Sequence, residues 1–270
     1  DQISYSTAIS ACRRNRQGKQ AALLIKQMQV DGLIVGEDDL TNALSACAAQ
    51  RIVSEGQLLW ISLKANSSHP PSLRAYTAAI GLRAAAADAQ GAIQLLDEMA
   101  VVGHQPDRVA FNAALRACGR AGACDDAFAL LARLRSEQLE PDAYSIGGVI
   151  TACSKVGRWK ESLELLNEME AASLLPGVAA YGAALDACGK AGKCTEGIAL
   201  LHTMHDRGIC PDIGCCNVIL HSCHKAQRWS DVYELLFVMR KWGVTNSSTL
   251  RPHHRGMWKQ AKRALGLPFN

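Results

Sequence analysis

The sequence predicts an all-α fold: a right-handed α-solenoid (superhelix) of about seven helix-turn-helix repeats, followed by a C-terminal capping helix. Two observations lead to this prediction. Apolar residues recur at helical spacing in pairs of short segments joined by a turn, and the same pair returns about every 35 residues along the 270-residue chain. One such hairpin is too short to bury its apolar stripes alone, so copies must stack on either side of it.

Residues 108–142 show the pattern of one unit. The first segment has the stripe spacing i, i+3, i+4 and i+7 at Phe111, Ala114, Leu115 and Cys118. Gly122 then interrupts the pattern, because glycine favours a turn over a continued helix. The second segment repeats the spacing at Ala127, Leu130, Leu131 and Leu134. The unit is therefore predicted to be a hairpin of two amphipathic helices.

Three apolar positions recur in phase through the chain and are predicted to form the core. The first set is Ile9, Leu44, Ile80, Leu115, Ile150, Leu185 and Leu220. The second set is Leu24, Leu59, Leu95, Leu130, Leu165, Leu200 and Leu235. The third set is Met28, Leu63, Met99, Leu134, Met169, Met204 and Met239.

Each step between equivalent residues is 35 residues, except for one step of 36 that we assign to an extra residue in the loop at 67–72. The array is predicted to span 1–247, with units at approximately 2–36, 37–72, 73–107, 108–142, 143–177, 178–212 and 213–247. Residues 248–270 are predicted to be a basic tail that contains the capping helix. Met257 to Leu265 would form this helix, with Trp258, Ala261 and Leu265 on the covered side, and RNA contact by the tail is the alternative.

Further recurrent residues carry a family resemblance. An aromatic residue lies in the first helix at Tyr5, Tyr76, Phe111 and Tyr181. An Ala-Gly or Val-Gly turn follows at 121–122, 156–157 and 191–192, and a Gly with a Pro-Asp pair closes units at Gly103/Pro106-Asp107 and Gly208/Pro211-Asp212. With the methionine position, these residues resemble the pentatricopeptide repeat of organellar RNA-binding proteins, in an array of the P type. A tetratricopeptide array has a period of 34, which no step shows.

The resemblance implies that two residues of each unit jointly select one RNA base. The base-reading position directly follows the aromatic residue, and the terminal position is the last residue of the unit. The pairs that carry a polar group are Ser6/Gly36, Thr41/Ser72, Thr77/Asp107, Asn112/Asp142 and Asn217/Ser247. By the family's pairing rules, the third of these prefers G, the fourth U and the fifth a pyrimidine, with the RNA 5′ end at the N-terminal units. Gly147 and Gly182 have no side chain to read with, so units five and six are expected to accept any base.

The family also uses a small aliphatic residue to sandwich each base, two residues before the aromatic one. Ile3, Val109 and Ala179 fit this role, whereas Asp38, Arg74, Tyr144 and Gly214 do not. A structural alternative exists for the terminal position, because Gly, Ser and Asp are all good N-caps for the helix that starts there.

Charge is distributed by repeat phase. The first-helix segments hold 12 Lys/Arg and 4 Asp/Glu, the tail holds 5 Lys/Arg and no acid, and the remainder holds 12 Lys/Arg and 21 Asp/Glu. If the first helices line the groove of the solenoid, this groove is basic and suits a polyanion. A recurrent basic position lies two residues after Cys12 and its equivalents in other units. It holds Arg14, Arg120, Lys155, Lys190 and Lys225. These cations are predicted to contact RNA phosphates, or alternatively to favour a helix C-terminus.

Six of the 11 cysteines occupy one repeat position, seven residues after the aromatic one: Cys12, Cys47, Cys118, Cys153, Cys188 and Cys223. We predict that they pack as small apolar residues. No CxxC motif is present, so a zinc ribbon is not supported, and a metal site among the cysteines and histidines of 215–224 is the alternative. We expect no metal and no cofactor. Free thiols in this number indicate a reducing compartment.

The resemblance implies sequence-selective binding of single-stranded RNA in organellar RNA metabolism (stability, processing or translation), in the mitochondrion or the chloroplast. The chain starts at Asp1 in the phase of a unit's end and shows no targeting segment, so we expect a piece of a longer protein. No run of 18 apolar residues predicts a membrane span.

We predict no catalytic residues, because the chain has neither an HxE with CxxC motif nor an acidic cluster for metal-dependent nuclease chemistry. Two alternatives stay open. One is a protein-interaction scaffold that contacts partners through exposed repeat ends, and the other is the targeting part of a larger RNA-processing enzyme.

Overall fold

The computed structural model describes residues 1–66, 69–244 and 252–267. Over these ranges the chain forms fifteen α-helices and no strands, which confirms the predicted all-α class. None of the helices in these ranges is both long and apolar enough to cross a bilayer. The chain divides into two compact units, Asp1–Val149 and Ile150–Asn270, which are described separately below.

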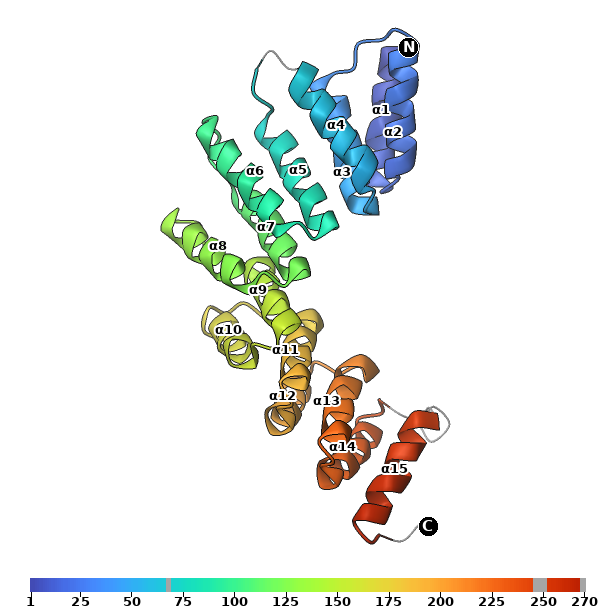
Figure 1. Ribbon diagram of the computed structural model, residues 1–270, viewed down its shortest axis with the longest axis vertical. Coiled ribbons are helices and arrows are strands. Elements are labelled where there is room, and N and C mark those ends of the chain that lie inside the picture. Colours follow the sequence, from blue (N-terminus) through green and yellow to red (C-terminus); the bar gives the residue numbers. More distant parts are fainter. Residues whose placement is uncertain (67–68, 245–251, 268–270) are drawn as a thin grey trace. The chain divides into compact units, whose positions relative to one another are not determined.

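Unit 1 contains four hairpins and the first half of a ninth helix. Its elements are α1 (Gln2–Arg14), α2 (Gly18–Val30), α3 (Glu37–Gln50), α4 (Val53–Asn66), α5 (Leu73–Ala86), α6 (Ala89–Val101), α7 (Arg108–Ala121), α8 (Cys124–Ser136) and α9 (Ala143–Val156), which continues into unit 2. The first helix of each hairpin packs against the next first helix, α1 on α3, α3 on α5 and α5 on α7. The second helices α2, α4 and α6 each contact the first helices of their own and of the following hairpin (Figure 1).

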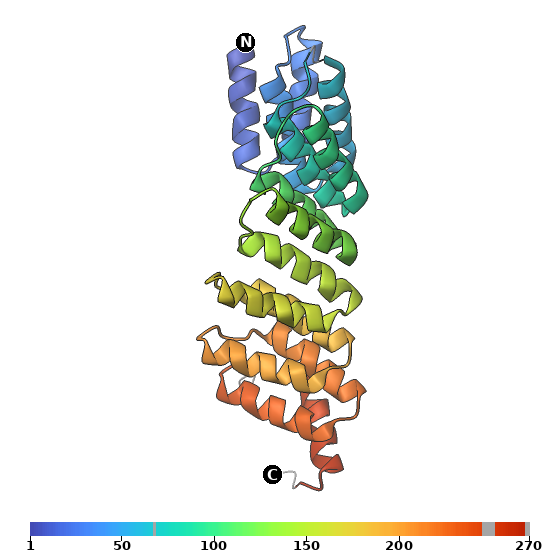
Figure 2. The same cartoon turned by 90° about the vertical axis from the view of Figure 1, so that its left-hand side faces the viewer.

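Unit 2 repeats this arrangement. After the second half of α9 come α10 (Trp159–Ala171), α11 (Val178–Lys190), α12 (Cys194–Asp206), α13 (Ile213–Lys225), α14 (Trp229–Lys241) and α15 (Pro252–Ala264). The first helix α11 packs against α13, and α12 contacts both of them. Figure 2 shows the hairpins of this unit, in yellow to red, following one another in a stack.

The recurrent apolar positions are buried as predicted. Every member of the first and third sets is at most 1% exposed, and the second set is at most 8% exposed apart from the half-buried Leu24. All six cysteines of the shared core position are also buried, which confirms that they pack in the core.

The capping helix is present as α15, which packs against α14. Met257 and Ala261 are buried, and the ring of Trp258 lies 4.9 Å from that of Tyr233 on α14. The prediction that Leu265 lies on the covered side is wrong. Leu265 follows the last residue of α15, where the chain leaves the α14 surface, and its side chain is 40% exposed.

Two glycines show how the hairpins are built. Gly122 ends α7 with a φ of +76°, a conformation that strongly favours glycine. At the start of α2, a Cβ on Gly18 would lie 2.7 Å from the Cα of Cys47, so glycine lets α2 approach α3 closely. The predicted place of the extra residue of the second repeat, the loop at 67–72, includes residues 67–68, which lie outside the described residues. The preceding helix α4 has 14 residues, where α6 has 13.

Candidate nucleic-acid interface

The first helices of unit 1 line a cavity of about 640 Å³. All of its lining residues belong to α1, α3, α5 and α7 or to the residues that flank these helices. Six of them are arginines: Arg13, Arg16, Arg51, Arg74, Arg116 and Arg120. Asp107 is the one carboxylate among the described lining residues. In this unit the first helices therefore provide a basic surface, as the charge pattern predicted.

Small residues keep the cavity open. Ala49 and Ala85 line it, and they occupy the recurrent basic position in units two and three, where a long side chain would fill the space. Gly81 of α5 also lines the cavity. Among the lining arginines, Arg120 occupies the recurrent basic position, and the other five come from other repeat positions.

Arg51 directly follows α3 and Arg16 lies two residues after the end of α1, at equivalent repeat positions, and both have left-handed backbone conformations with φ of 61° and 55°. The equivalent residues in later repeats also have positive φ: Ala87, Gly122, Gly157, Gly192 and Gln227. A Cβ is disfavoured in this conformation. The signal that could have revealed these two cations is an arginine where the repeat expects glycine.

Few of the cavity arginines are neutralised by carboxylates. Arg74 forms an ion pair with Asp38 at 3.2 Å, and Arg120 Nη1 donates a hydrogen bond to the Ala84 carbonyl at 3.3 Å. In the part of the chain that the structure describes, Arg13, Arg16, Arg51 and Arg116 form no ion pair. The pKa of the Arg120 guanidinium is lowered by burial and then by the positive charges of Arg51 and Arg116.

The predicted pair Asn112/Asp142 is brought together, although 30 residues separate its members. Asn112 Nδ2 donates to Asp142 Oδ1 at 3.1 Å and to Oδ2 at 3.2 Å, while the Ser145 hydroxyl donates to Asn112 Oδ1 at 2.6 Å. Asp142 Oδ1 also accepts the backbone N–H groups of Tyr144 and Ser145, which caps α9. The terminal residue thus serves as N-cap and as partner of the base-reading residue at the same time.

The electrostatics of Asp142 follow from these contacts. Burial alone would raise the pKa of this carboxyl, but the hydrogen bonds from Ser145 and Asn112 and the charge of Arg108, whose Nε lies 3.4 Å away, together lower it. Asp142 is therefore an ionised acceptor that holds the Asn112 amide in one orientation.

Thr77 and Asp107 both line the cavity. The Thr77 hydroxyl donates to the Leu73 carbonyl at 2.8 Å, and Asp107 Oδ1 accepts the Ala110 N–H at 2.8 Å as the N-cap of α7. Ser72 caps α5 by accepting the Ala75 N–H at 3.3 Å. Residues at the terminal position therefore do cap the following helix, as the structural alternative expected. Asp107 caps α7 and also lines the cavity.

The remaining base-reading residues differ in their access to solvent. Ser6 and Asn217 are half-buried, and Asn217 Oδ1 accepts no hydrogen bond from the described residues. Gly36 is the N-cap of α3 and offers no side chain, and Ser247 lies outside the described residues. Thr41 differs from the other base-reading residues, because α3 packs between α1 and α5 and Thr41 is only 1% exposed.

The recurrent basic position divides into two groups. Lys190 Nζ donates to the Ser154 carbonyl at 2.7 Å and to Asp186 Oδ2 at 2.6 Å, and Arg120 makes the equivalent contact with Ala84. Both carbonyls lie in the last turn of the preceding first helix. These two cations therefore contact the C-terminal end of a first helix, as the alternative expected, but that helix is the preceding one and not their own. Arg14, Lys155 and Lys225 are exposed.

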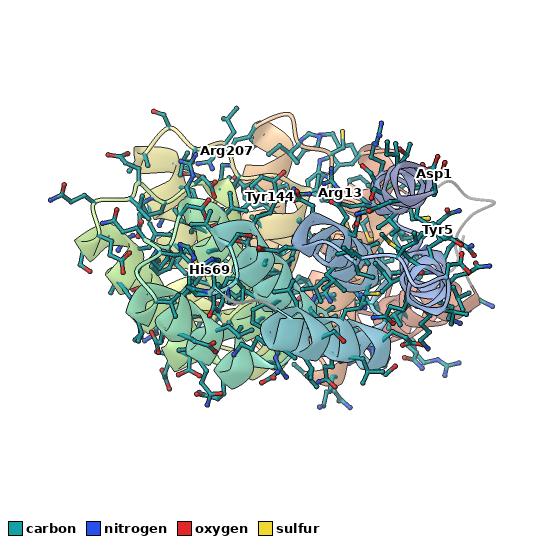
Figure 3. All side chains as sticks on the ribbon, turned by 90° about the horizontal axis from the view of Figure 1, so that it is seen from above. Asp1, Tyr5, Arg13, His69, Tyr144 and Arg207 are labelled. Atoms are coloured by element: carbon teal, nitrogen blue, oxygen red, sulfur yellow. The ribbon has the colours of Figure 1, made fainter. Side chains whose placement is uncertain are left out.

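Residues predicted to sandwich bases are open to solvent at the start of their helices. Ile3 and Val109 are 79% and 62% exposed, and Ala179 is exposed. Tyr144, which does not fit the family's aliphatic pattern, occupies the same position in α9 and is 82% exposed (Figure 3). Val109 also lines the basic cavity. Exposed aromatic side chains are suited to stacking on bases.

The alternative of a metal site concerned the cysteines and histidines of 215–224. Burial raises the pKa of Cys215 to about 11 and that of Cys216 to about 12. His221 is exposed whereas Cys223 is buried, so they face different surroundings. Among the residues with described placement, no three metal-binding side chains converge.

The fold is that of a helical-repeat protein, and in unit 1 the first helices form a basic surface. Residues 3–33, 147–174, 179–209 and 214–244 match the model of the PPR repeat, and residues 70–121 and 94–145 match that of the pentatricopeptide repeat domain. These ranges cover more than half of the sequence, and the chain belongs to the pentatricopeptide repeat family. Residues 34–69, which include Thr41, fall outside the matched ranges.

Individual relatives are similar over different shares of their length. A mitochondrial pentatricopeptide repeat-containing protein of Arabidopsis thaliana is 30% identical over 99 residues, which is 37% of this chain and 14% of that protein. The crystal structure of the pentatricopeptide repeat protein PPR10 with an 18-nucleotide RNA element superposes with a TM-score of 0.76 at 17% identity, covering 96% of this chain and 37% of PPR10. PPR10 from maize gives 0.62 at 26% identity, covering 96% and 36%.

A third solved structure is the PPR domain of protein-only RNase P 1 of Arabidopsis thaliana in complex with tRNA. It matches with a TM-score of 0.57 at 16% identity, over 68% of this chain and 95% of that domain. Similarities at such low identity establish the fold of the chain.

Proposed function

We propose that this chain binds single-stranded RNA along its first helices, in organellar RNA stability, processing or translation. The observation that carries the proposal is the cavity of unit 1, where six arginines lie beside the base-reading pair Thr77/Asp107. RNA supplies one negative charge per nucleotide, and the guanidinium group matches phosphate with a bidentate fork. The likeness to PPR10, which was solved with an RNA element, supports this choice of ligand.

Base selection is proposed at Ser6/Gly36, Thr77/Asp107, Asn112/Asp142 and Asn217/Ser247, but not at the buried Thr41. The geometry of Asn112 explains how a base could be read. One amide N–H is directed at the two carboxylate oxygens of Asp142, and one Oδ1 lone pair accepts from Ser145. The second N–H and the second lone pair remain for a base edge. Uracil presents a matching carbonyl acceptor and N–H donor.

Stacking is proposed to add affinity with little selectivity. Ile3, Val109 and Ala179 would pack against the faces of bases, and the exposed ring of Tyr144 would do so more strongly. Stacking of a base on an aromatic side chain contributes about 1–3 kcal/mol and tolerates every base.

Phosphate contact is proposed first for Arg14, Lys155 and Lys225, whose side chains are exposed. Arg120 and Lys190 already donate to carbonyls of the preceding helix and would contribute to RNA binding through their remaining N–H groups. Binding is therefore expected to depend on salt, with a slope that reports the number of contacts.

A second candidate role is the targeting part of an RNA-processing enzyme. The chain covers 95% of the PPR domain of protein-only RNase P 1, which favours this role. The repeats would then hold the RNA, while another part of a longer protein acts on it. Comparing cleavage of a bound RNA by this chain and by a full-length protein would distinguish the two roles.

Selection from a randomised RNA pool tests the proposed function. We expect enrichment of a core 5′-G-U-N-N-Y-3′, in which the two unread bases face Gly147 and Gly182. A pool that is not retained at low salt would instead favour a protein-interaction scaffold. Retention of RNA without enrichment of any sequence would support RNA binding and contradict base selection.

A further inference from the structure

We infer that the cavity between α1, α3, α5 and α7 binds a terminal phosphomonoester of the RNA strand. This inference rests on the proposed RNA binding and assigns a particular chemical group to one part of the surface. The cavity is lined by the six arginines Arg13, Arg16, Arg51, Arg74, Arg116 and Arg120.

The cavity holds more positive charge than internal phosphodiesters require. In units five to seven, each first-helix segment carries one Lys or Arg, at Lys155, Lys190 and Lys225. That number matches one phosphodiester per repeat. In the compact unit Asp1–Val149, six arginines from four repeats line one space, where one per repeat would give four. Asp107, the one carboxylate among the described lining residues, also caps α7. A terminal phosphate carries nearly two negative charges near neutral pH and three acceptor oxygens, so it can engage several guanidinium groups at once.

The arginines are held together despite their mutual repulsion. Arg51 and Arg116 both lower the pKa of Arg120, and neither forms an ion pair with a described residue. Arg16 and Arg51 also adopt a backbone conformation that disfavours a Cβ. Ala87 and Gln227 have the same conformation at the equivalent repeat position, so it belongs to the turn of the repeat, and the argument for an anion rests on the charges. Repelling charges that line one cavity are accounted for by an anion that neutralises them.

The size of the cavity fits this ligand. Its volume of about 640 Å³ lies in the range of small-molecule sites. Ala49 and Ala85 leave open the space that a basic side chain fills in other units. The terminal nucleotide could enter this space with its phosphate, while the rest of the strand continues along the first helices.

The test compares three oligonucleotides of one selected sequence, about ten nucleotides long to cover the repeats. They carry 5′-OH and 3′-OH, 5′-phosphate and 3′-OH, or 5′-OH and 3′-phosphate, and affinity is measured by fluorescence anisotropy at fixed salt. The double variant Arg51→Gln/Arg116→Gln removes two cavity cations. The control Lys19→Gln/Lys26→Gln removes two exposed cations of α2 in the same unit.

We expect the strand with the 5′-phosphate to bind at least about tenfold more tightly than the unphosphorylated strand, the effect of one charge-assisted hydrogen bond, because the RNA is expected to run with its 5′ end at the N-terminal repeats. A gain confined to the 3′-phosphate would contradict this assignment. The gain should disappear in the arginine variant, with its circular dichroism spectrum unchanged, and persist in the lysine control.

Equal affinity for all three strands would overturn the inference and leave the proposed RNA binding intact. A gain that survives in the arginine variant would overturn the assignment to this cavity. Failure of every strand to bind would contradict the proposed function itself, and this inference with it.

Discussion

Replacing Arg51 by glycine should stabilise the fold and weaken RNA binding at the same time. The Arg51 backbone has a φ of 61° and a ψ of 35°, which costs a residue with a Cβ about 1–2 kcal/mol. Glycine is more flexible in the unfolded chain, and this offsets about 0.5–1 kcal/mol of the relief. The exposed arginine side chain contributes little packing, so a net gain of about 0.5–1 kcal/mol is expected.

The same change removes one cation from the cavity. Loss of one charge-assisted contact should weaken RNA binding by about 1.5 kcal/mol, or roughly tenfold, and flatten the salt dependence by about 0.7. Ala87→Gly is the matched control, because Ala87 follows α5 in the same conformation, with a φ of 56°, but carries no charge. It should raise stability by a similar amount and leave RNA affinity unchanged.

Urea unfolding followed by circular dichroism measures the first effect, and fluorescence anisotropy at several salt concentrations measures the second. If Arg51→Gly binds RNA as tightly as the unaltered chain does, Arg51 is not part of the interface. If both glycine variants are less stable than the unaltered chain, the argument from backbone conformation is wrong.

Three further predictions concern single side chains. Cys188→Ala should cost about 1 kcal/mol of stability without changing RNA affinity, because the thiol is 0% exposed in the core; a large loss of RNA binding would contradict this. Lys155→Gln/Lys225→Gln should flatten the salt dependence of RNA affinity by about 1.4 in all. Lys190→Gln should mainly lower the urea midpoint, because it loses a hydrogen bond to the preceding first helix. An equal salt dependence for both variants would contradict the division of these cations into two groups. Asp142→Asn should lower stability at neutral pH. The pKa of Asp142 is lowered in the folded chain, so its ionised form stabilises the fold fully above the ordinary value of 3.8. This stabilisation, and with it the difference between variant and unaltered chain, should be lost as the pH falls from 3.8 through the lower pKa of the folded chain.

The fold could be predicted because its signals are local and repeated. Phe111, Leu115 and Leu134 follow helical spacing within one unit, and the period repeats that spacing through the chain, so burial of the core positions followed directly. Details at element ends could not be predicted in the same way. Leu265 has the spacing of a covered residue, but α15 ends before it and leaves it exposed.

The candidate site could be predicted only in part, because it depends on contacts between repeats. The pairing of Asn112 with Asp142 was expected from the family resemblance, and the two side chains do share hydrogen bonds. The burial of Thr41 depends on how α3 packs against its neighbours, which the repeat pattern does not contain. Arg51 was missed because it occupies a position where turn formation, and not charge, was the expected property.

The most direct test of the proposed reading mechanism is a base-preference measurement on Asn112→Thr, with Asp142 left in place. In the unaltered chain we expect U at the second position of the core sequence, because the fixed Asn112 amide offers one donor and one acceptor. The variant should prefer G at that position and keep its preferences at the neighbouring positions. A preference for U that persists in the variant, or that is absent from the unaltered chain, would contradict the proposal that this pair reads one base.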